Sequence, residues 1–495
     1  MKKIILICAL LAVVSCAPRT GMQDQSLQNN NLQTLSPVEL RMVIAEMPKG
    51  ADLHTHLSGI PYAEDYLKWA AEDNACIVKS SGKIVAGPCG DGTLAAKDAY
   101  SNAKIWNMAV SELSVRENRR DNQLWGHDQF FGAFGKMGVA KYNTGRLLAH
   151  AAKQADRDHV QYLEVMLSMY GPKSSDEKIV NKAWTGNFAE SLKNLEDSDL
   201  YGDIEAVVEN INSAEKEKSR ILGKDPAKKV HIKYINQISR GNDPASVFAQ
   251  LAFAFKLALS DSRVVGINLV GPEDGPIAMR DYELHMKMVS FFDSRWGHSV
   301  PITLHAGELT PALANPEGLS NHIGLIVDDV NARRIGHAVD LPYEKGAESL
   351  VKKMKKRQMA IEILLGSNDA ILKVSGKEHP LQTYLKAGVP VVLASDDMGI
   401  ARSTLTDEYV RAVLDQKLTY QQLKEAARNS LEYSFLDGGS LWVNRAYGNM
   451  VKACSESSGV KDECDKFLSG SPKADLQWNL EKQFKGFESK YPYLK

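Results

Sequence analysis

The sequence predicts an α/β protein: a (β/α)8 barrel of the TIM type, with an insertion after its first strand and a helical extension at its C-terminus. Short runs rich in Val, Ile and Leu alternate with longer amphipathic or polar stretches, as parallel strands and helices require. The 495 residues are many for one ordinary domain but suit a barrel of roughly 250 residues or more with additions. Imidazole and carboxylate side chains gather at the ends of the strand candidates, where such barrels carry their sites.

Eight strand candidates lie beyond Pro48, and helix-like sequence separates them. They span residues 51–57, 160–168, 230–239, 264–271, 301–308, 334–339, 359–368 and 389–397. A doubly wound open sheet is the alternative for the same alternation, but closure into a barrel is the simplest arrangement of eight parallel strands.

The remaining sequence divides the chain into four segments. We expect a signal peptide at 1–15, a lipidated N-terminus and polar tether at 16–46, the barrel at 47–438 and the C-terminal helical extension at 439–495. An insertion at about 72–130 is too long for a simple connection between strand and helix, so we expect it to cover the mouth of the site.

The first sixteen residues are typical of an export signal. Lys2 and Lys3 precede an apolar run of 11 residues, which is about half the length that ~30 Å of hydrocarbon requires. The residues before Cys16 resemble a bacterial lipobox, in which this cysteine is acylated after cleavage. We therefore expect a lipoprotein of the bacterial cell envelope, anchored to a membrane through Cys16 outside the cytoplasm. A plain secretory peptide is the alternative.

The charge composition argues against a nucleic-acid partner. Lys and Arg number 60 against 61 Asp and Glu, a net charge of -1, so the broad basic field of a nucleic-acid binder is missing. We therefore expect no nucleic-acid partner.

Four cysteines remain once Cys8 is assigned to the signal and Cys16 to the lipid. Cys76 with Cys89, and Cys454 with Cys464, are the two pairs that close short polar loops, and an oxidising compartment favours both as disulfides. Zinc binding by these cysteines is the alternative, although no C-x-x-C spacing supports it.

A second group of side chains predicts a metal site. His54 and His56 lie two residues apart on one strand candidate, so both imidazoles project from the same face. His305 lies near the end of the fifth candidate, and Asp396 near the end of the eighth. Three imidazoles and one carboxylate suit Zn²⁺ and leave a position for water. The fourth candidate has no Lys or Glu to bridge two ions, which favours one zinc per chain.

Four motifs now resemble a known family. Residues 47–57, 305–308, 334–338 and 394–397 are similar, in the same order, to the successive motifs of the adenosine deaminase family. The resemblance extends from about Met47 to Phe435. Export, the insertion and the cysteine pairs resemble the secreted, growth-factor-like branch.

The resemblance implies a mechanism and assigns residues to it. His54, His56, His305 and Asp396 would hold the zinc. Glu308 would protonate purine N1 as hydroxide attacks C6, and His337 would take or orient the proton of the water. Asp397 would hydrogen-bond the attacking hydroxyl or N7, and the backbone of Gly271 would face N3. The implied reaction converts adenosine, and 2'-deoxyadenosine, to inosine or its 2'-deoxy form plus ammonia outside the cytoplasm.

Other interpretations of these four positions stay open at this point. Glu308 could be an ion-pair partner at the barrel mouth, and His337 a core histidine or second metal ligand. Asp397 could cap a helix, and Gly271 could serve a turn. The other histidines, among them His127 and His379, lie in no matching motif and are assigned to core or surface positions.

Three departures from the family pattern concern the substrate. Ser58 stands where many members have an Asp that contacts the ribose 5'-hydroxyl, Met166 where Arg is usual, and Asn268 where Asp is common. The runner-up function is therefore deamination of another 6-aminopurine, such as adenine or a modified adenosine, or action on a non-purine amide. A non-catalytic nucleoside-binding lipoprotein is disfavoured, because every motif position holds a competent residue. The signature of base-editing zinc deaminases is absent.

Overall fold

Eight parallel strands form the centre of the computed structural model, which describes residues 32–119, 121–455 and 461–494. Each strand overlaps one of the eight predicted segments. The strands are β1 (Gly50–His56), β5 (Val160–Leu167), β6 (His231–Ser239), β7 (Val264–Val270), β8 (Thr303–Ala306), β9 (Arg334–His337), β10 (Ala360–Ile363) and β11 (Val391–Leu393). The predicted signal peptide and Cys16 lie outside the described residues.

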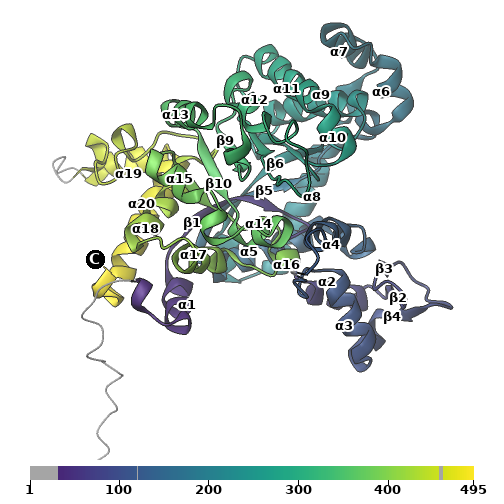
Figure 1. Ribbon diagram of the computed structural model, residues 1–495, viewed down its shortest axis with the longest axis horizontal. Helices are drawn as coiled ribbons and strands as arrows, with labels where there is room; N and C mark the ends of the chain where they lie inside the picture. Colours follow the sequence, from purple (N-terminus) through teal and green to yellow (C-terminus); the bar gives the residue numbers. More distant parts are fainter. Residues whose placement is uncertain (1–31, 120, 456–460, 495) are drawn as a thin grey trace, which may run out of the picture.

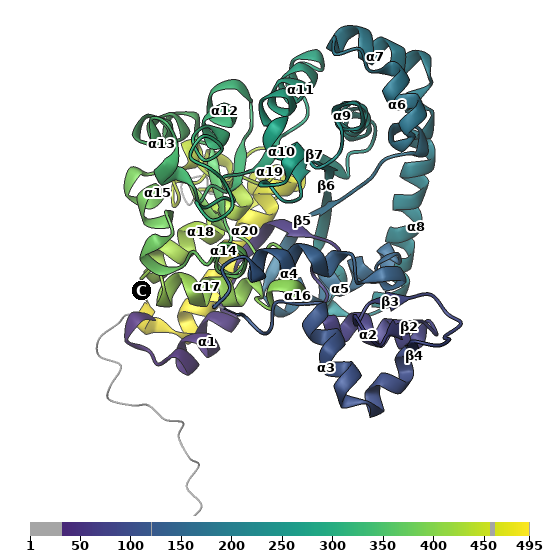
Figure 2. The ribbon, with the colours of Figure 1, turned by 45° about the vertical axis from the view of Figure 1, so that its right-hand side comes forward.

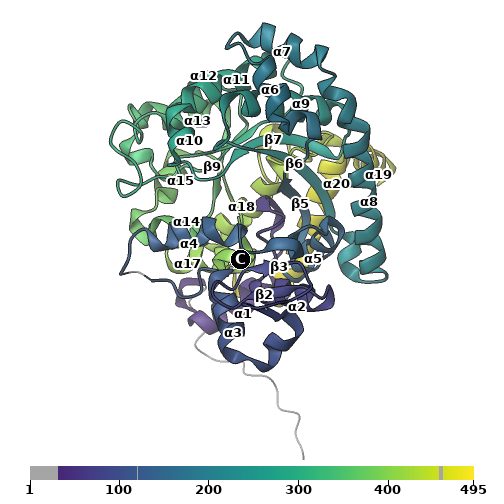
Figure 3. The ribbon, with the colours of Figure 1, turned by 90° about the vertical axis from the view of Figure 1, so that its right-hand side faces the viewer.

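Two four-stranded sheets make up the ring, in the orders β1-β5-β6-β7 and β11-β10-β9-β8. A bridge between Thr55 and Asp396 joins them on one side, and a bridge between Ile267 and Ile302 joins them on the other. The backbone N–H of His56 also donates to the carbonyl of Asp396 at 3.1 Å. The predicted barrel is thereby confirmed, and Figure 3 shows β5, β6 and β7 side by side within it.

Helices surround the strands, as Figure 2 shows for α8 and α9. The helix α9 is almost wholly apolar and buried, and Asp243 caps it by accepting from the N–H of Ser246. The outer helices are α5 (Thr144–Arg157), α6 (Glu177–Ala183), α7 (Phe188–Asp197), α8 (Ile204–Leu222), α9 (Pro244–Ser260), α10 (Pro276–Arg280), α11 (Tyr282–Arg295), α12 (His322–Asp329), α13 (Ala347–Arg357), α14 (Leu365–Leu372), α15 (Leu381–Ala387), α16 (Met398–Ala401), α17 (Leu405–Leu414) and α18 (Tyr420–Glu432).

The insertion after β1 forms a small subdomain at the lower right of Figure 1. It holds α2 (Ala63–Glu72), α3 (Ala103–Glu112) and an antiparallel sheet of β2 (Cys76–Val78), β3 (Ile84–Val85) and β4 (Thr93–Ala95). A disulfide joins Cys76 to Cys89. Its last helix, α4 (Trp125–Phe134), returns to the barrel and packs on α14. A Cβ at Gly126 would lie 1.9 Å from the carbonyl oxygen of Ala370, so only glycine allows this close approach.

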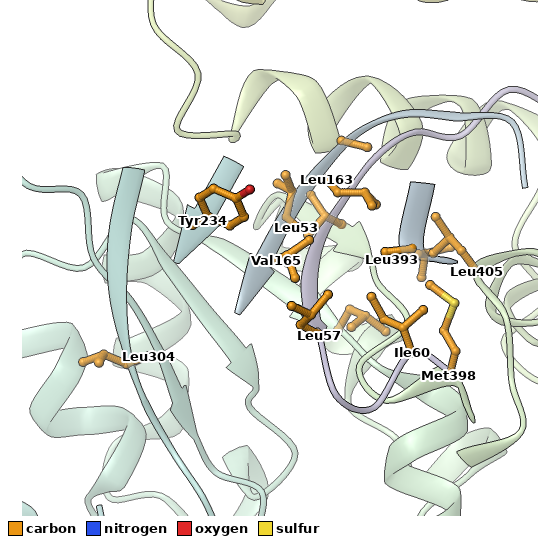
Figure 4. Close-up of a cluster of buried hydrophobic side chains, with 14 of the residues drawn as sticks. Leu53, Leu57, Ile60, Leu163, Val165, Tyr234, Leu304, Leu393, Met398 and Leu405 are labelled. Carbon is orange, nitrogen blue, oxygen red and sulfur yellow. The ribbon is translucent and has the colours of Figure 1, made fainter. Parts of the chain in front are cut away.

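Apolar side chains fill the space between strands and helices, and Figure 4 shows part of this core. Leu53, Leu163 and Leu393 come from three different strands and are each at most 1% exposed. Burial of such side chains is worth about 1.5–3 kcal/mol each relative to full exposure. The core therefore fixes the strand ends that carry the polar residues.

Of the N- and C-terminal helices, the first precedes β1 directly, the last contacts β1, and the one between them packs on the last. They are α1 (Pro37–Glu46), α19 (Lys461–Ser469) and α20 (Pro472–Lys490), and a disulfide joins Cys454 to Cys464. Among the described residues, no helix is both long and apolar enough to cross a membrane.

A buried ion-pair network closes the barrel floor. Arg334 is 0% exposed and donates to Glu164 at 2.6 Å and to Glu362 at 2.5 Å. Its guanidinium lies 3.7 Å from the centre of the Phe435 ring. Buried charges need such partners, and Glu362 extends this network to the first histidine of β1.

Candidate active site

Three imidazoles and a carboxylate meet above the strands. His54 and His56 come from β1, His305 from β8, and Asp396 follows β11, and one ligand atom of each lies within 4.8 Å of the others. The Nε2 atoms of His56 and His305 are 3.3 Å apart, and Asp396 Oδ1 lies 3.4 Å from His56 Nε2. The structure therefore brings together the four residues that the sequence pattern selects as metal ligands.

The far nitrogen of each imidazole contacts an oxygen acceptor. His54 Nδ1 lies 2.6 Å from Glu362 Oε2, and His56 Nδ1 lies 2.8 Å from Gln237 Oε1. His305 Nδ1 lies 3.0 Å from Asn268 Oδ1. Carboxylate and amide oxygens only accept, so each ring donates from Nδ1 and keeps its lone pair on Nε2.

The directions of these lone pairs show whether the four residues suit a metal ion. Three Nε2 lone pairs and a carboxylate directed at one point repel one another unless a cation lies between them. His54 Nε2 is buried and has no hydrogen-bond partner in the described part of the chain. The four residues therefore suit a tetrahedral divalent ion with nitrogen and oxygen ligands.

Next to this cluster lies a buried acid. Glu308 follows β8, and its Oε1 is 3.4 Å from His337 Nδ1 at the end of β9. Burial, with the nearby charges of Asp396 and Glu273, raises the pKa of Glu308 well above its ordinary value. This shift favours the protonated form of the side chain, which can donate a proton.

A hydrogen-bond chain fixes the tautomer of His337. The N–H of Leu381 donates to His379 Nδ1, so His379 carries its proton on Nε2, 3.1 Å from Asn368 Oδ1. The amide of Asn368 then points its Nδ2 donor at His337 Nδ1, 2.9 Å away. The neutral His337 ring therefore carries its proton on Nε2.

That Nε2 atom is buried and lacks a hydrogen-bond partner among the described residues. Burial lowers the pKa of His337 to about 3, so the ring is neutral at physiological pH. His337 and Asp396 both have positive φ angles, 67° and 59°, and sparsely populated backbone conformations of this kind cluster at functional sites.

Asp397 completes the group. It occupies the N-cap position of α16, but its side chain makes no capping hydrogen bond. Its Oδ1 atom is buried and, among the described residues, unpartnered. Burial and the adjacent Asp396 raise the pKa of Asp397 well above its ordinary value. A Cβ at Gly59 would lie 1.6 Å from Asp397 Oδ1, so glycine is required there.

One cavity of about 330 Å³ is bordered by His56, His305, Glu308, His337, Asp396 and Asp397. Ser58 and Gly271 line it, and Gly271 has a φ of +96° that favours glycine. Phe130, Phe131 and Phe134 of α4 also line it, and the last two lie just beyond the predicted insertion at about 72–130. Among the described residues that line the cavity there is no Lys or Arg.

One polar contact ties the insertion to the barrel at this mouth. His127 of α4 places Nε2 3.0 Å from Asp274 Oδ1, in the loop that follows β7. Hydrogen bonds to Asp274 and Asp128 outweigh burial and raise the pKa of His127. We call this contact the α4 latch.

Sequence reasoning missed the residues that hold the predicted ones. Glu273 accepts from the backbone N–H of Gly307 at 3.1 Å and of Glu308 at 2.9 Å, which fixes the turn that carries the acid. Its position two residues beyond Gly271 was an available signal, as was the charge of Glu362 inside an apolar strand candidate. No sequence signal pointed to Asn368 or His379.

Two of the family departures turn out to be neighbours. Asn268 Nδ2 lies 3.2 Å from the sulfur of Met166, while Asn268 Oδ1 holds His305. The two changes therefore leave the metal-binding cluster supported.

Fold and site together define a class: (β/α)8 barrels with a metal-binding cluster at the C-terminal ends of their strands. Within that class the chain belongs to the adenosine deaminase family, whose model, described as "Adenosine deaminase", matches residues 130–440.

Individual relatives match over shorter segments. An aminodeoxyfutalosine deaminase of Streptomyces coelicolor is 32% identical over 178 residues, which cover 35% of this chain and 41% of the relative. An adenosine deaminase of Aliivibrio fischeri is 31% identical over 181 residues, 36% of this chain and 49% of the relative. The chain thus matches less than half the length of these curated relatives.

Solved structures support the fold. The N6-methyl-AMP deaminase of Arabidopsis thaliana superposes with a TM-score of 0.51 at 18% identity, over 88% of this chain and 99% of its own. An amidohydrolase from Burkholderia ambifaria with bound zinc gives a TM-score of 0.52 at 14% identity, over 95% of this chain and 97% of its own.

Proposed function

We propose that this protein is a zinc-dependent hydrolase that converts adenosine and water to inosine and ammonia, and that it accepts 2'-deoxyadenosine. The observation that carries the proposal is the position of three buried, reactive groups in the same cavity as the metal-binding cluster. These are the acid of Glu308, the Nε2–H of His337 and the carboxyl of Asp397.

His54, His56, His305 and Asp396 would hold one zinc ion per chain, and when bound it would supply a Lewis acid that lowers the pKa of water at the site. A second set of possible ligands, Glu308, His337 and Asp396, shares Asp396 with the first. We assign Glu308 and His337 to proton handling, because Nδ1 of His337 accepts from Asn368 and its Nε2 carries a proton, which leaves no lone pair on this ring for an ion.

The chain's own residues then account for the chemistry at C6. Addition of water to C6 places an electron pair on N1, and the protonated Glu308 can donate to N1 and neutralise it. The Nε2–H of His337 donates to the attacking oxygen and orients it. The protonated Asp397 can donate to N7 of the purine. One proton of the attacking water passes to the 6-amino group, and the C6–N6 bond breaks with release of ammonia. The remaining O–H proton returns to the Glu308 carboxylate as the C6 carbonyl of inosine forms, which restores the acid.

The fixed tautomer narrows the role of His337. Its Nδ1 accepts from Asn368, and its Nε2 already bears the proton, so the neutral ring has no free lone pair toward the cavity. Of the two roles that the family resemblance allows, orienting the water is therefore the one that this geometry favours.

The cavity favours a nucleoside over a nucleotide. Related solved structures from Arabidopsis contain IMP or GMP. A bound 5'-phosphate needs a cation or a cluster of N–H donors, and the described lining residues include no Lys or Arg. We therefore propose substrates that lack a 5'-phosphate.

Another 6-aminopurine remains the second candidate, and Ser58 favours it, because this side chain cannot replace the carboxylate that holds the 5'-hydroxyl in many family members. One matched relative is itself named an aminodeoxyfutalosine deaminase.

A substrate panel tests both candidates. Zinc-loaded protein should release ammonia from adenosine and 2'-deoxyadenosine, and AMP should react far more slowly. Turnover of adenine or 5'-deoxyadenosine alone would move the assignment to the second candidate. No turnover of any compound would refute deamination and leave a nucleoside-binding lipoprotein.

We further propose that the protein is exported and anchored through lipid on Cys16. The two disulfides suit an oxidising compartment. Labelling with a fatty acid should mark the wild type but not Cys16→Ala, and peptide mapping without reductant should recover the Cys76–Cys89 and Cys454–Cys464 peptides as pairs.

A further inference from the structure

A second cavity of about 730 Å³ lies at the rim of the barrel, between the end of β5 and the helices α5 and α8. We call it the rim groove. Its wall carries apolar and aromatic side chains, among them Tyr142, Met169, Tyr170, Val207 and Ile211, together with polar ones such as Asn143, Asn210 and Ser213. Nothing in the proposed reaction uses it.

The rim groove borders the active-site cavity. Ser168 lines the groove, and its hydroxyl oxygen lies 3.5 Å from Nε2 of Gln237, which lines the active-site cavity. On the neighbouring strand, the N–H of Leu57 donates to the carbonyl of Met166 at 3.0 Å, so residues 57–58 run beside 167–168. Gln237 and Ser168 therefore form the partition between the two spaces.

The orientation of a bound purine follows from the reactive groups. C6 must face Glu308 and His337, so N9 and its sugar lie at the opposite end of the ring system, away from these groups. Ser58 stands where many family members have the Asp that contacts the 5'-hydroxyl, and Gln237 contacts His56 through Nδ1, the ring nitrogen that faces away from the metal-binding cluster. A substituent on the far end of the sugar is thus directed toward the partition.

We propose that the rim groove binds an uncharged apolar or aromatic group attached to the 5' carbon of the nucleoside. This inference rests on the proposed deamination and specifies the substrate class of the same site. Ser58 is small and places no carboxylate in the path of such a group. Tyr142, at the groove, exposes 72% of its surface, and a bound aryl group would cover part of it.

The charges that line the groove determine whether it binds a neutral or an acidic 5' substituent. Glu217 is the one charged side chain among its described lining residues. A carboxylate or phosphate in the groove would lose water without gaining a cation, because no Lys or Arg is among the described lining residues and the nearby Arg220 already pairs with Glu217 at 2.7 Å. A neutral aryl group would gain apolar contacts instead.

A matched pair of substrates tests the charge argument. We expect the wild type to deaminate 5'-benzylthio-5'-deoxyadenosine with a kcat/KM about tenfold or more above that of its para-carboxy derivative. Its KM for the neutral compound should also be below its KM for adenosine. Equal kcat/KM values for the two thioethers, or a KM no lower than that for adenosine, would overturn the proposal.

A substitution in the groove tests whether the 5' substituent binds there. Ser213 of α8 is exposed at the groove, whereas Ser219 on the same helix is exposed outside it. Ser213→Trp should lower kcat/KM for the benzylthio compound about tenfold relative to adenosine, and Ser219→Trp should leave that ratio unchanged. A ratio unaffected by Ser213→Trp would place the 5' group elsewhere.

Binding separates this proposal from the proposed reaction. Calorimetry with 5'-benzylthio-5'-deoxyinosine, a product analogue, requires no turnover. Tighter binding than inosine, lost in Ser213→Trp, supports the groove even if every deamination assay fails. Binding no tighter than inosine would overturn the groove while leaving adenosine deamination intact.

Discussion

The centre of the site and its mouth are built in different ways. At the centre, ligands come from strand ends, and the far nitrogen of each metal-site imidazole has its own acceptor in Glu362, Gln237 or Asn268. At the mouth, three phenylalanines of α4 line the cavity, and the α4 latch between His127 and Asp274 holds this helix to the loop after β7.

The difference separates chemistry from selectivity. Groups that hold a metal or move a proton need positions fixed to within a fraction of an ångström, which strands and satisfied hydrogen bonds supply. A surface that selects a substituent needs shape and exclusion of water, which an insertion can supply and vary. Changes at the centre should therefore abolish the reaction, and changes at the mouth should alter its scope.

The largest effect is expected from removing a metal ligand. His56→Ala should lose both zinc and deamination, since three remaining ligands hold the ion poorly and Gln237 loses its partner. Metal analysis should find one zinc per chain in the wild type. Two tightly held ions, or an active protein without metal, would refute the four-ligand assignment.

Next in size is the loss of the acid. Glu308→Gln should keep zinc and folding but lower kcat by about 10³-fold, because the amide cannot give up a proton to N1. Single-turnover assays together with zinc content check this. Near-normal kcat in a zinc-loaded variant would show that another group protonates the purine.

A smaller effect is expected from freeing the tautomer of His337. Asn368→Leu removes its Nδ1 donor, so the ring can carry its proton on either nitrogen, and kcat should fall about 10–100-fold with zinc retained.

Nitrogen NMR of labelled histidine should show mixed tautomers in this variant and Nε2–H alone in the wild type. His379→Gln keeps an N–H donor toward Asn368 and should retain more activity than His379→Leu. A proton on Nδ1 of His337 in the wild type would contradict the hydrogen-bond chain from His379 through Asn368.

The sequence was sufficient for the centre because its residues lie on strands with period-two spacing and at predictable ends. His54 and His56 share a face by that spacing, and barrel topology alone brings His305 and Asp396 to the same rim. The residues that orient these side chains through hydrogen bonds could not be predicted from the sequence. Asn368 reaches His337 from a helix that was expected to be strand, since residues 359–368 read as one apolar run but become β10 followed by α14.

The mouth was less predictable for a related reason. The insertion could be recognised by its length, yet nothing in its sequence says which face of α4 meets the barrel. Gly126 decides this by allowing contact with Ala370, and a contact of that kind between distant segments has no local pattern. The partner of His127, 147 residues away, is equally invisible.

The smallest effect is expected at the α4 latch, and its pH dependence shows whether the mouth is held by charge. Because the pKa of His127 is raised in the folded protein, the pair contributes its full stability below the ordinary histidine pKa of about 6.5 and loses it as pH rises through the raised value. His127→Gln keeps a donor for Asp274 but no charge, so it should cost about 1 kcal/mol at pH 6 and about nothing at pH 9.

Thermal unfolding of both proteins across this pH range measures the difference, expected at about 1–2 °C in Tm for a chain of this size. His298→Gln is the matched control, since His298 pairs with Asp293 away from the cavity. If the latch holds the phenylalanines in place, His127→Gln should raise KM for adenosine a few-fold and leave kcat of the bound substrate unchanged, as expected for a change confined to the mouth. A fall in kcat of the same size would instead place α4 with the catalytic centre and erase the distinction between the two regions.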